Sequence, residues 1–338
     1  MSHESLPQFV QTLLDPGCYD HPVTEVELVQ THISLVLLAG EFVYKFKKPV
    51  NFGFLDFSDL EKRRYCCEQE LVLNRRLCPD IYLGLVTVTK GNDDRFALNG
   101  EGEVVEYGVK MVRMPEKRMM SGLIQRGELN GEHIDALVEV LVDFYRKAEG
   151  GVEIAKFGTA ESVAVNVLEN FEQTKGFIGQ TALTQEQFDL VSAYARKVLA
   201  QNELFPKRID GGYIRDCHGD LYSANICLAD KVYIFDCIEF NQRFRYCDVA
   251  SDVAFLAMDL DFHGLGQFST QFIEQFCLRS RDASLKPLLN FYKCYRAYVR
   301  GKIGLFTAAD PAVDPKIQES CRQQAAQYFR LAERYAAE

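Results

Sequence analysis

The sequence predicts an α+β fold in two parts, a small β-rich N-terminal part and a larger, mainly helical C-terminal part. Up to about residue 115, the apolar residues mostly alternate with a period of two, which indicates strands around a single helical stretch. After Met114-Pro115, apolar residues recur at helical spacing. We therefore expect an N-terminal domain over residues 1–114 and a C-terminal domain over residues 115–338.

Strands and one helix account for the N-terminal part. In the third expected strand, residues 42–47, alternation places Val43, Lys45 and Lys47 on one face and the aromatic residues Phe42, Tyr44 and Phe46 on the other. Ser58 followed by Glu61 has the pattern of a capping box, and the helix that it opens should end before Pro79. The other expected strands cover residues 26–30, 33–38, 82–89 and 103–112.

The C-terminal part reads as helices with one β interruption. Thr184 and Gln187 form a second predicted capping box. Residues 225–228 and 232–235 have the pattern of a short hairpin that turns at Ala229-Asp230-Lys231. Helical spacing covers residues 132–148, 160–174, 184–203, 268–280, 284–304 and 313–336.

The net charge and the composition argue against several classes of protein. The net charge of 38 − 48 = −10 argues against a general nucleic-acid-binding protein. No run approaches eighteen apolar residues, and the N-terminus lacks a basic start and an apolar stretch, so we expect neither a membrane span nor a secretory signal. None of the eleven cysteines stands in a C-x-x-C pair, which favours free thiols in a reducing, cytoplasmic setting.

One segment concentrates the candidate chemistry. His218-Gly219-Asp220 is followed by Asn225 and, eleven residues later, by Asp236. Phosphoryl transfer needs a positioned acceptor hydroxyl and cations on the phosphates, and magnesium prefers oxygen ligands of this kind. Taken alone, Asp220 could simply be a turn residue. The whole H-G-D-x-x-x-x-N pattern with the later aspartate favours a phosphoryl-transfer site.

These residues resemble the aminoglycoside phosphotransferase family, which shares a two-lobed, protein-kinase-like fold with choline kinases. The resemblance implies an enzyme that uses ATP and Mg²⁺ to phosphorylate a hydroxyl of a small molecule. It implies that Asp220 is the catalytic base, that Asn225 and Asp236 hold magnesium, and that His218 braces the loop. The sequence is also similar to an uncharacterised bacterial branch of this family, through residues 31–34, 44–49, 54–57, 234–241 and 248–252.

The resemblance requires a phosphate-binding lysine on the third strand and an acidic partner on the following helix. Lys45 fits the lysine position, and Lys47 on the same strand face is the alternative. Glu70 shares the more apolar side of the helix, where a carboxylate needs a cation. Glu68 is four residues after Arg64, a spacing typical of an exposed ion pair. We expect Glu70 to be the partner.

The contacts to the nucleotide are less defined by the sequence. The turn before the second strand contains no glycine, so the hydroxyls of Thr31 and Ser34 are candidates for phosphate contacts, with ordinary strand-edge roles as the alternative. The adenine is expected where the strand over 103–112 continues from Val112 to Met114, through backbone groups.

The acceptor is left open. Asp259, Asp261 and Glu274 could serve a cationic acceptor, as in aminoglycoside-binding lobes. Lys293, Arg296 and Arg300 share one helical face, which is either a solvated basic face or a site for an anionic acceptor. Asp248 and Asp252, at a probable helix start, are expected mainly to brace the fold.

Two other function classes are alternatives to a small-molecule kinase. One is a nucleotide-binding regulatory module without turnover, and the other is a transferase that moves a nucleotidyl group or modifies a protein. Members of the uncharacterised branch often carry a P-loop ATPase after this domain. The motif G-x-x-x-x-G-K-[ST] does not occur here, so we expect this chain to be the kinase-like half alone, and a separate ATPase partner stays an open alternative.

Overall fold

A computed structural model describes residues 6–201, 203–311 and 313–338. The chain divides into two compact units. The first unit contains the residues up to Arg118 together with Tyr233–Gln242, and the second contains Met119–Val232 and Arg243–Glu338. No helix among the described residues is both long and apolar enough to cross a membrane.

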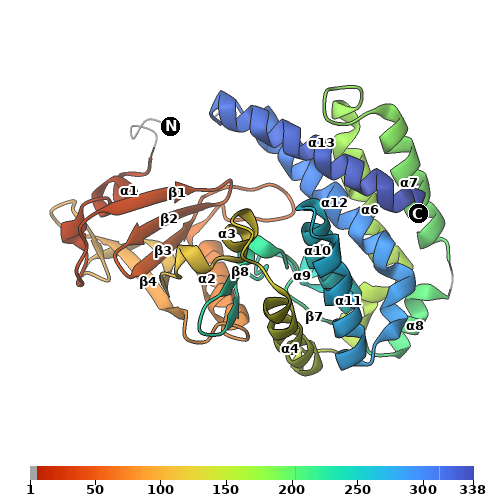
Figure 1. Cartoon of the computed structure of the whole chain (residues 1–338). Helices are drawn as coiled ribbons and strands as arrows, with labels where there is room; N and C mark the ends of the chain where they lie inside the picture. Colours follow the sequence, from red (N-terminus) through yellow and green to blue (C-terminus); the bar gives the residue numbers. More distant parts are fainter. Residues whose placement is uncertain (1–5, 202, 312) are drawn as a thin grey trace. The chain divides into compact units, whose positions relative to one another are not determined.

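An antiparallel sheet forms the body of the first unit (Figure 1). Its order in the described residues is β1-β2-β3-β6-β4-β5. One face packs on the short helix α1, Gln8–Leu13, whose Val10 and Leu13 are fully buried with Phe46 of β3. The strands are β1 Val26–Gln30, β2 Ser34–Ala39, β3 Phe42–Lys47, β4 Tyr82–Lys90, β5 Phe96–Leu98 and β6 Glu103–Val112. The predicted strands are confirmed, and β5 is additional.

Helix α2, Leu60–Asn74, packs against β4 and β6. A buried ion pair between Arg63 and Glu106, with N–O distances of 2.9 Å, fixes this contact. The predicted cap at Ser58 is wrong. Asp59 caps the helix by accepting from the N–H of Lys62, while the Ser58 hydroxyl donates to Asp56. The carboxylate competes better for the helix N–H than a hydroxyl already engaged with another aspartate.

The second unit is mainly helical (Figure 1). The predicted helices are present as α4 Gly131–Lys147, α6 Ala160–Thr174, α7 Gln185–Leu199, α11 Gly266–Ser280, α12 Lys286–Ala309 and α13 Pro315–Ala337. The further helices are α3 Met120–Gln125, α5 Val152–Ala155, α8 Leu204–Asp210, α9 Gln242–Arg245 and α10 Val249–Phe262. Its short strands are β7 Ile214–Asp216, β8 Ile226–Leu228 and β10 Tyr246–Asp248. Strand β9, Val232–Ile234, begins at the last residue of the segment Met119–Val232 and continues into the first unit.

Two helix starts follow the sequence signals. The capping box of Thr184 and Gln187 is present at the start of α7. Asp248 caps α10 by accepting from the N–H of Ala250. The full extent of α10 was not predicted, because almost every residue from Val249 to Leu260 is buried and the segment lacks a polar face.

The boundary at 114/115 differs from the observed division. The chain returns to the first unit at Tyr233–Gln242, a segment that begins within β9, the second strand of the predicted hairpin. The N–H of Cys237 donates to the side-chain oxygen of Asn74 on α2 at 2.8 Å, and the Cys78 thiol donates to the carbonyl of Ile234 at 2.9 Å. The segment carrying Asp236 therefore packs with the residues of the first unit that precede it by about 160 positions.

Candidate active site

An ion-pair network of five side chains lies in the first unit, on one face of β3. Lys45 Nζ is 2.9 Å from Glu70 Oε1 and 2.5 Å from Asp236 Oδ1. Lys47 Nζ is 2.8 Å from Glu70 Oε2 and also contacts Glu239 Oε1. The period-two pattern of β3 directs both lysines to the face on which α2 lies, so that Glu70 binds one lysine through each oxygen.

The two glutamates that were candidates for the lysine partner differ in their burial and in their contacts. The Glu70 side chain is 1% exposed and contacts both strand lysines. Glu68 is 44% exposed and forms an ion pair with Arg64 at 3.0 Å, as its i,i+4 spacing predicts. A buried carboxylate requires a cation, whereas an exposed pair contributes little to stability.

The two lysines also differ in their surroundings. Lys47 is 2% exposed and lies 5.0 Å from the centre of the Phe57 ring, with both of its carboxylate partners buried. Lys45 is 15% exposed and contacts Asp236, whose side chain is 44% exposed. Lys45 therefore has the position from which an amine can reach a ligand, while Lys47 is enclosed by protein.

Burial alone would favour the neutral forms of the Lys45 amine and the Glu70 carboxylate, and the attraction between opposite charges prevents this. Burial opposes the charge of Lys45, but Asp236, Glu70 and Glu239 raise the pKa of Lys45 well above its usual value. Burial likewise opposes ionisation of Glu70, but Lys45 and Lys47 lower the pKa of Glu70 to about 2. The amine and the carboxylate are both charged at neutral pH.

This lowered pKa predicts a pH-dependent contribution to stability. Because the pKa of Glu70 is about 2 when folded and 4.5 when unperturbed, its contribution is complete above pH 4.5 and is lost as the pH falls toward 2. We expect Glu70→Gln to lower the free energy of unfolding by about 3 kcal/mol at pH 7, and by progressively less below pH 4.5. Urea unfolding of both proteins from pH 7 to pH 2.5 measures the difference.

The matched control is Glu68→Gln, which removes an exposed carboxylate from the same helix and should change stability by less than about 0.5 kcal/mol at every pH. A stability loss in Glu70→Gln that is the same at pH 3 and pH 7 would contradict the assigned ion pair.

The backbone around Asp236 is held in a particular shape. Asp236 has a φ angle of 63°, in the left-handed region that aspartate adopts more readily than most residues. Its N–H donates to the hydroxyl of Tyr82 at 3.2 Å, and the next N–H is held by Asn74. A non-glycine residue in this region is mildly strained and often marks a functional position.

The turn between β1 and β2 is closed by a hydroxyl. Thr31 Oγ1 accepts from the N–H of Ser34 at 2.9 Å and of Ile33 at 3.3 Å. Ser34 is 2% exposed. The threonine side chain thus organises a turn that contains no glycine, and its oxygen already has partners in the chain.

The end of β6 leaves one backbone donor open. The N–H groups of Val112 and Arg113 donate to the carbonyls of Ile81 and Glu41, at 2.9 and 2.8 Å. Within the part of the chain that the structure describes, no backbone carbonyl accepts a hydrogen bond from the N–H of Met114. Val112 and Met114 also line an open pocket with the β2–β3 turn.

In the second unit, the loop of residues 218–225 is anchored by Asp252 of α10. The Asp252 carboxylate accepts from the N–H of His218 at 2.7 Å and of Gly219 at 3.0 Å. It also accepts from the Tyr145 hydroxyl at 3.2 Å. Asp252 is fully buried, and this bracing role agrees with the expectation from the sequence.

Within the 218–225 loop, the three polar residues of the motif contact one another. His218 is fully buried, and its Nδ1 accepts from the N–H of Asp220 at 3.2 Å. Asn225 Nδ2 donates to both the carbonyl and the carboxylate of Asp220, each at 3.0 Å. Gly219 has a φ angle of 88°, which only glycine adopts without strain. The loop therefore holds the Asp220 carboxylate from two sides.

Two anchors of this loop were missed by the sequence analysis. Asp259 accepts from the N–H of Ser223 at 3.0 Å. Arg296 donates to the carbonyl of Gly219 at 3.0 Å and lies 3.6 Å from Asp252. Arg296 is 5% exposed, so it belongs to the interior.

The prediction of a solvated basic face on α12 is therefore wrong. Lys293 is also buried, with its amine 2.9 Å from Asp261 and 3.1 Å from Ser269. Helical spacing correctly placed Lys293, Arg296 and Arg300 on one side of the helix, but it could not show that α10 and α11 supply partners there.

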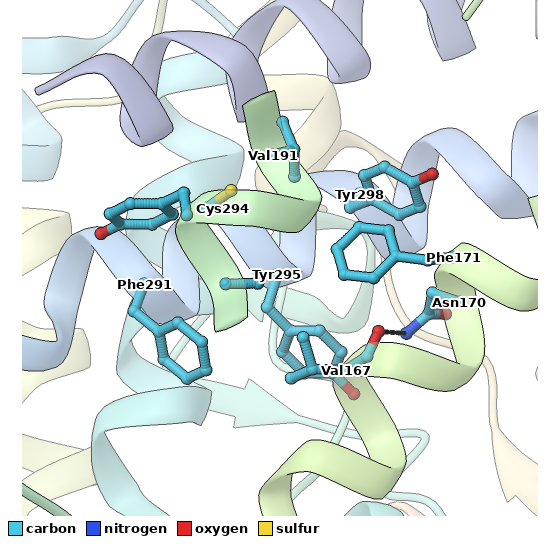
Figure 2. A pocket seen from close by; sticks show the side chains of 10 residues that line it. Val167, Asn170, Phe171, Val191, Phe291, Cys294, Tyr295 and Tyr298 are labelled. Carbon is cyan, nitrogen blue, oxygen red and sulfur yellow. Dashed lines mark hydrogen bonds between the residues drawn. The ribbon is translucent and has the colours of Figure 1, made fainter. Parts of the chain in front are cut away.

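A small cavity in the second unit lies apart from these residues. Figure 2 shows it among α6, α7 and α12, lined by apolar and aromatic side chains such as Val167, Phe171, Val191 and Tyr298. Its volume of about 10 Å³ is at the lower limit for a single water molecule. None of the residues of the predicted site lines it, so we interpret it as a packing gap.

Comparison with known proteins finds relatives by sequence and by structure. No family model matches the chain. Uncharacterized proteins of Mycobacterium tuberculosis and Mycobacterium bovis are each 33% identical over 293 residues, which covers 86% of this chain and 57% of the relatives. The chain thus spans little more than half the length of these relatives.

Solved structures show the same fold. Amicoumacin kinase in complex with AMP-PNP and Ca²⁺ superposes with a TM-score of 0.53 at 12% identity, covering 95% of this chain and 92% of that chain. A choline/ethanolamine kinase family protein from Mesorhizobium loti gives 0.52 at 12% identity, covering 96% and 98%. This chain has the small-molecule kinase fold. A Ralstonia eutropha protein assigned to the aminoglycoside phosphotransferases gives 0.50 at 12% identity, covering 94% of each chain.

The small-molecule kinase fold confirms the predicted two-lobed α+β architecture and the resemblance on which it rested. The roles of the individual residues stay predictions.

Proposed function

We propose that this chain is an ATP- and Mg²⁺-dependent phosphotransferase that transfers the γ-phosphate to a hydroxyl of a small molecule. In this proposal Lys45 binds the phosphates, Asp220 accepts the proton of the hydroxyl, and Asn225 and Asp236 hold the metal ion. Met114 contributes a backbone donor to the adenine.

The Lys45–Glu70–Asp236 cluster is the observation that carries the proposal. Here the amine joins a buried carboxylate to an aspartate that is 44% exposed, on a segment with left-handed backbone. Buried groups that close partners keep charged are typical of functional sites.

The donor atoms present suit magnesium. Asp236 binds Lys45 through Oδ1, which leaves Oδ2 for a cation. Asn225 uses its nitrogen toward Asp220, so that its carbonyl oxygen is free to act as a ligand. Magnesium takes a few protein oxygens together with phosphate oxygens and water. When bound, the ion would offset negative charge on the phosphates.

Asp220 is suited to the proton-accepting role because the loop fixes its position from two sides. Its N–H is held by His218, and its carboxylate accepts from a neutral amide, Asn225. A carboxylate at this point orients an acceptor hydroxyl and takes its proton as the bond to phosphorus forms.

The two strand lysines provide a prediction that separates binding from stability. We expect Lys45→Met to lower kcat/KM for ATP at least 100-fold, since it removes the amine that can reach the phosphates. We expect Lys47→Met to lower the free energy of unfolding by about 3 kcal/mol, because Glu70 and Glu239 lose a buried cation. Steady-state kinetics and urea unfolding of both variants test this assignment, and the reverse outcome would exchange the two roles.

The proposal itself is tested by transfer of label. The protein is incubated with Mg²⁺, γ-labelled ATP and a cell metabolite extract, beside the variant Asp220→Asn. Label in a small molecule with the wild type alone supports a kinase. Nucleotide binding without transfer in either sample would refute it and favour a regulatory module.

A further inference from the structure

We propose that the acceptor carries an anionic group, a carboxylate or a phosphate, and that Arg300 binds this group beside the 218–225 loop. The inference rests on the proposed function and adds the chemical class of the acceptor.

Arg300 lies against the loop that contains the predicted base. From α12, its guanidinium is 4.7 Å from the ring centre of Tyr222 and 5.7 Å from that of Tyr328. Tyr222 follows Asp220 by two residues and stacks on Phe255 of α10, with ring centres 5.6 Å apart. The aromatic contacts hold the guanidinium at the loop by cation–π attraction, and the Tyr328 hydroxyl also accepts a hydrogen bond from it.

The other buried arginines of the second unit all have carboxylate partners. Arg208 contacts Asp248 and Asp282, Arg245 contacts Asp216, and Arg296 lies near Asp252, at N–O distances from 2.5 to 3.6 Å. This is the usual state of an arginine removed from water.

Arg300 differs from these arginines. It is half-buried, and within the described residues no carboxylate lies within ion-pair distance of it. Its Nε is buried without a hydrogen-bond partner. The Tyr328 hydroxyl accepts from another nitrogen of the guanidinium, so Nε is the donor for which the described residues supply no acceptor. A buried donor without an acceptor is costly. A carboxylate or phosphate oxygen meets this need, and the arginine fork matches both groups.

The charge of Arg300 is secure. Burial disfavours the charged form, but Tyr222, Tyr328 and Asp220 raise the pKa of Arg300 above its ordinary value. A fixed cation next to the loop attracts an anionic acceptor and repels a cationic one.

The carboxylates that could bind a cationic acceptor are already engaged. Asp259 accepts from the loop backbone at Ser223, and Asp261 binds Lys293 and the hydroxyl of Tyr335. Glu274 is on the exposed side of α11. The expectation that these residues could form a site for a polycation therefore has no support in the structure.

Binding of small matched probes tests the inference. The nucleotide site is first filled with AMP-PNP and Mg²⁺, so that added anions cannot occupy the position of a nucleotide phosphate. Inorganic phosphate, glycolate, neutral ethylene glycol and cationic ethanolamine are then titrated by ligand-observed NMR. We expect glycolate or phosphate to bind, and Arg300→Gln to weaken that binding about 10- to 100-fold. Comparing the two anions distinguishes a carboxylate site from a phosphate site.

Two further variants control for folding and for surface charge. Arg300→Lys keeps the charge but loses the fork, and should restore part of the affinity. Arg330→Gln, at an exposed position of α13, should change nothing. Thermal unfolding confirms that each variant is folded.

The inference is overturned if no anion binds to the wild type, if ethanolamine binds as well as glycolate, or if Arg300→Gln leaves anion binding unchanged. It is also overturned if Arg300→Gln weakens AMP-PNP instead, because the arginine would then serve the nucleotide. Failure of AMP-PNP to bind to the wild type counts against the proposed function alone. In that case the anions are titrated in the absence of nucleotide, because there is no nucleotide-phosphate site that they could occupy instead.

Discussion

Replacing Asp220 with asparagine is expected to lower kcat for phosphoryl transfer by about 10²- to 10⁴-fold, with little change in nucleotide affinity. Asparagine has nearly the same shape, and the backbone bonds of Asp220 to His218 and Asn225 do not depend on its carboxylate. The amide cannot accept a proton, so that only the proton-accepting role is lost. Steady-state kinetics together with AMP-PNP titration measure both quantities.

The matched control is Asp189→Asn, at an exposed position of α7, which should leave kcat within a factor of two. An Asp220→Asn protein with full activity would show that proton acceptance lies elsewhere, and Asp220 would then be a turn residue.

The second large effect is expected at Asp252. The Asp252 carboxylate now accepts from His218, Gly219 and Tyr145 through two oxygens. In Asp252→Asn one of these oxygens becomes an NH₂ group, which cannot accept a hydrogen bond. We expect a loss of about 3 kcal/mol in the free energy of unfolding, because a fully buried charge and its hydrogen bonds are removed. We also expect kcat to fall at least tenfold, since the loop that holds Asp220 is no longer fixed. Urea unfolding and kinetics at a temperature where the variant is folded measure the two losses.

Asp143→Asn provides the comparison, because Asp143 forms a surface ion pair with Lys147 on α4 and should contribute less than about 0.5 kcal/mol. A variant at Asp252 that loses stability but keeps full kcat in its folded fraction would show that Asp252 supports only the fold.

The sequence was informative where one element determines the outcome. Alternation along residues 42–47 placed both lysines on one face of β3, and the i,i+4 spacing of Arg64 and Glu68 identified an exposed pair. The motif from His218 to Asn225 predicted residues that contact one another in a short loop.

Sequence reasoning failed where partners come from distant segments. Glu239 was not singled out, although a glutamate within the apolar run Cys237-Ile238-Glu239-Phe240 is a signal for a buried carboxylate that needs a cation. The partners of Lys293 and Arg296 lie on other helices, 32 and 44 positions earlier for Asp261 and Asp252, so helical spacing alone could not identify them. The same limit hid α10, whose burial on all sides erases the pattern that reveals a helix.

The proposed reaction is the transfer of the γ-phosphate of ATP to a small molecule. Its most direct test is parallel incubation of the protein and a metabolite extract with Mg²⁺ and either γ-labelled or α-labelled ATP, with an excess of EDTA as the metal-free control. We expect a small labelled product from the γ-labelled nucleotide only, and none with EDTA. A labelled product from α-labelled ATP would contradict it and indicate nucleotidyl transfer instead.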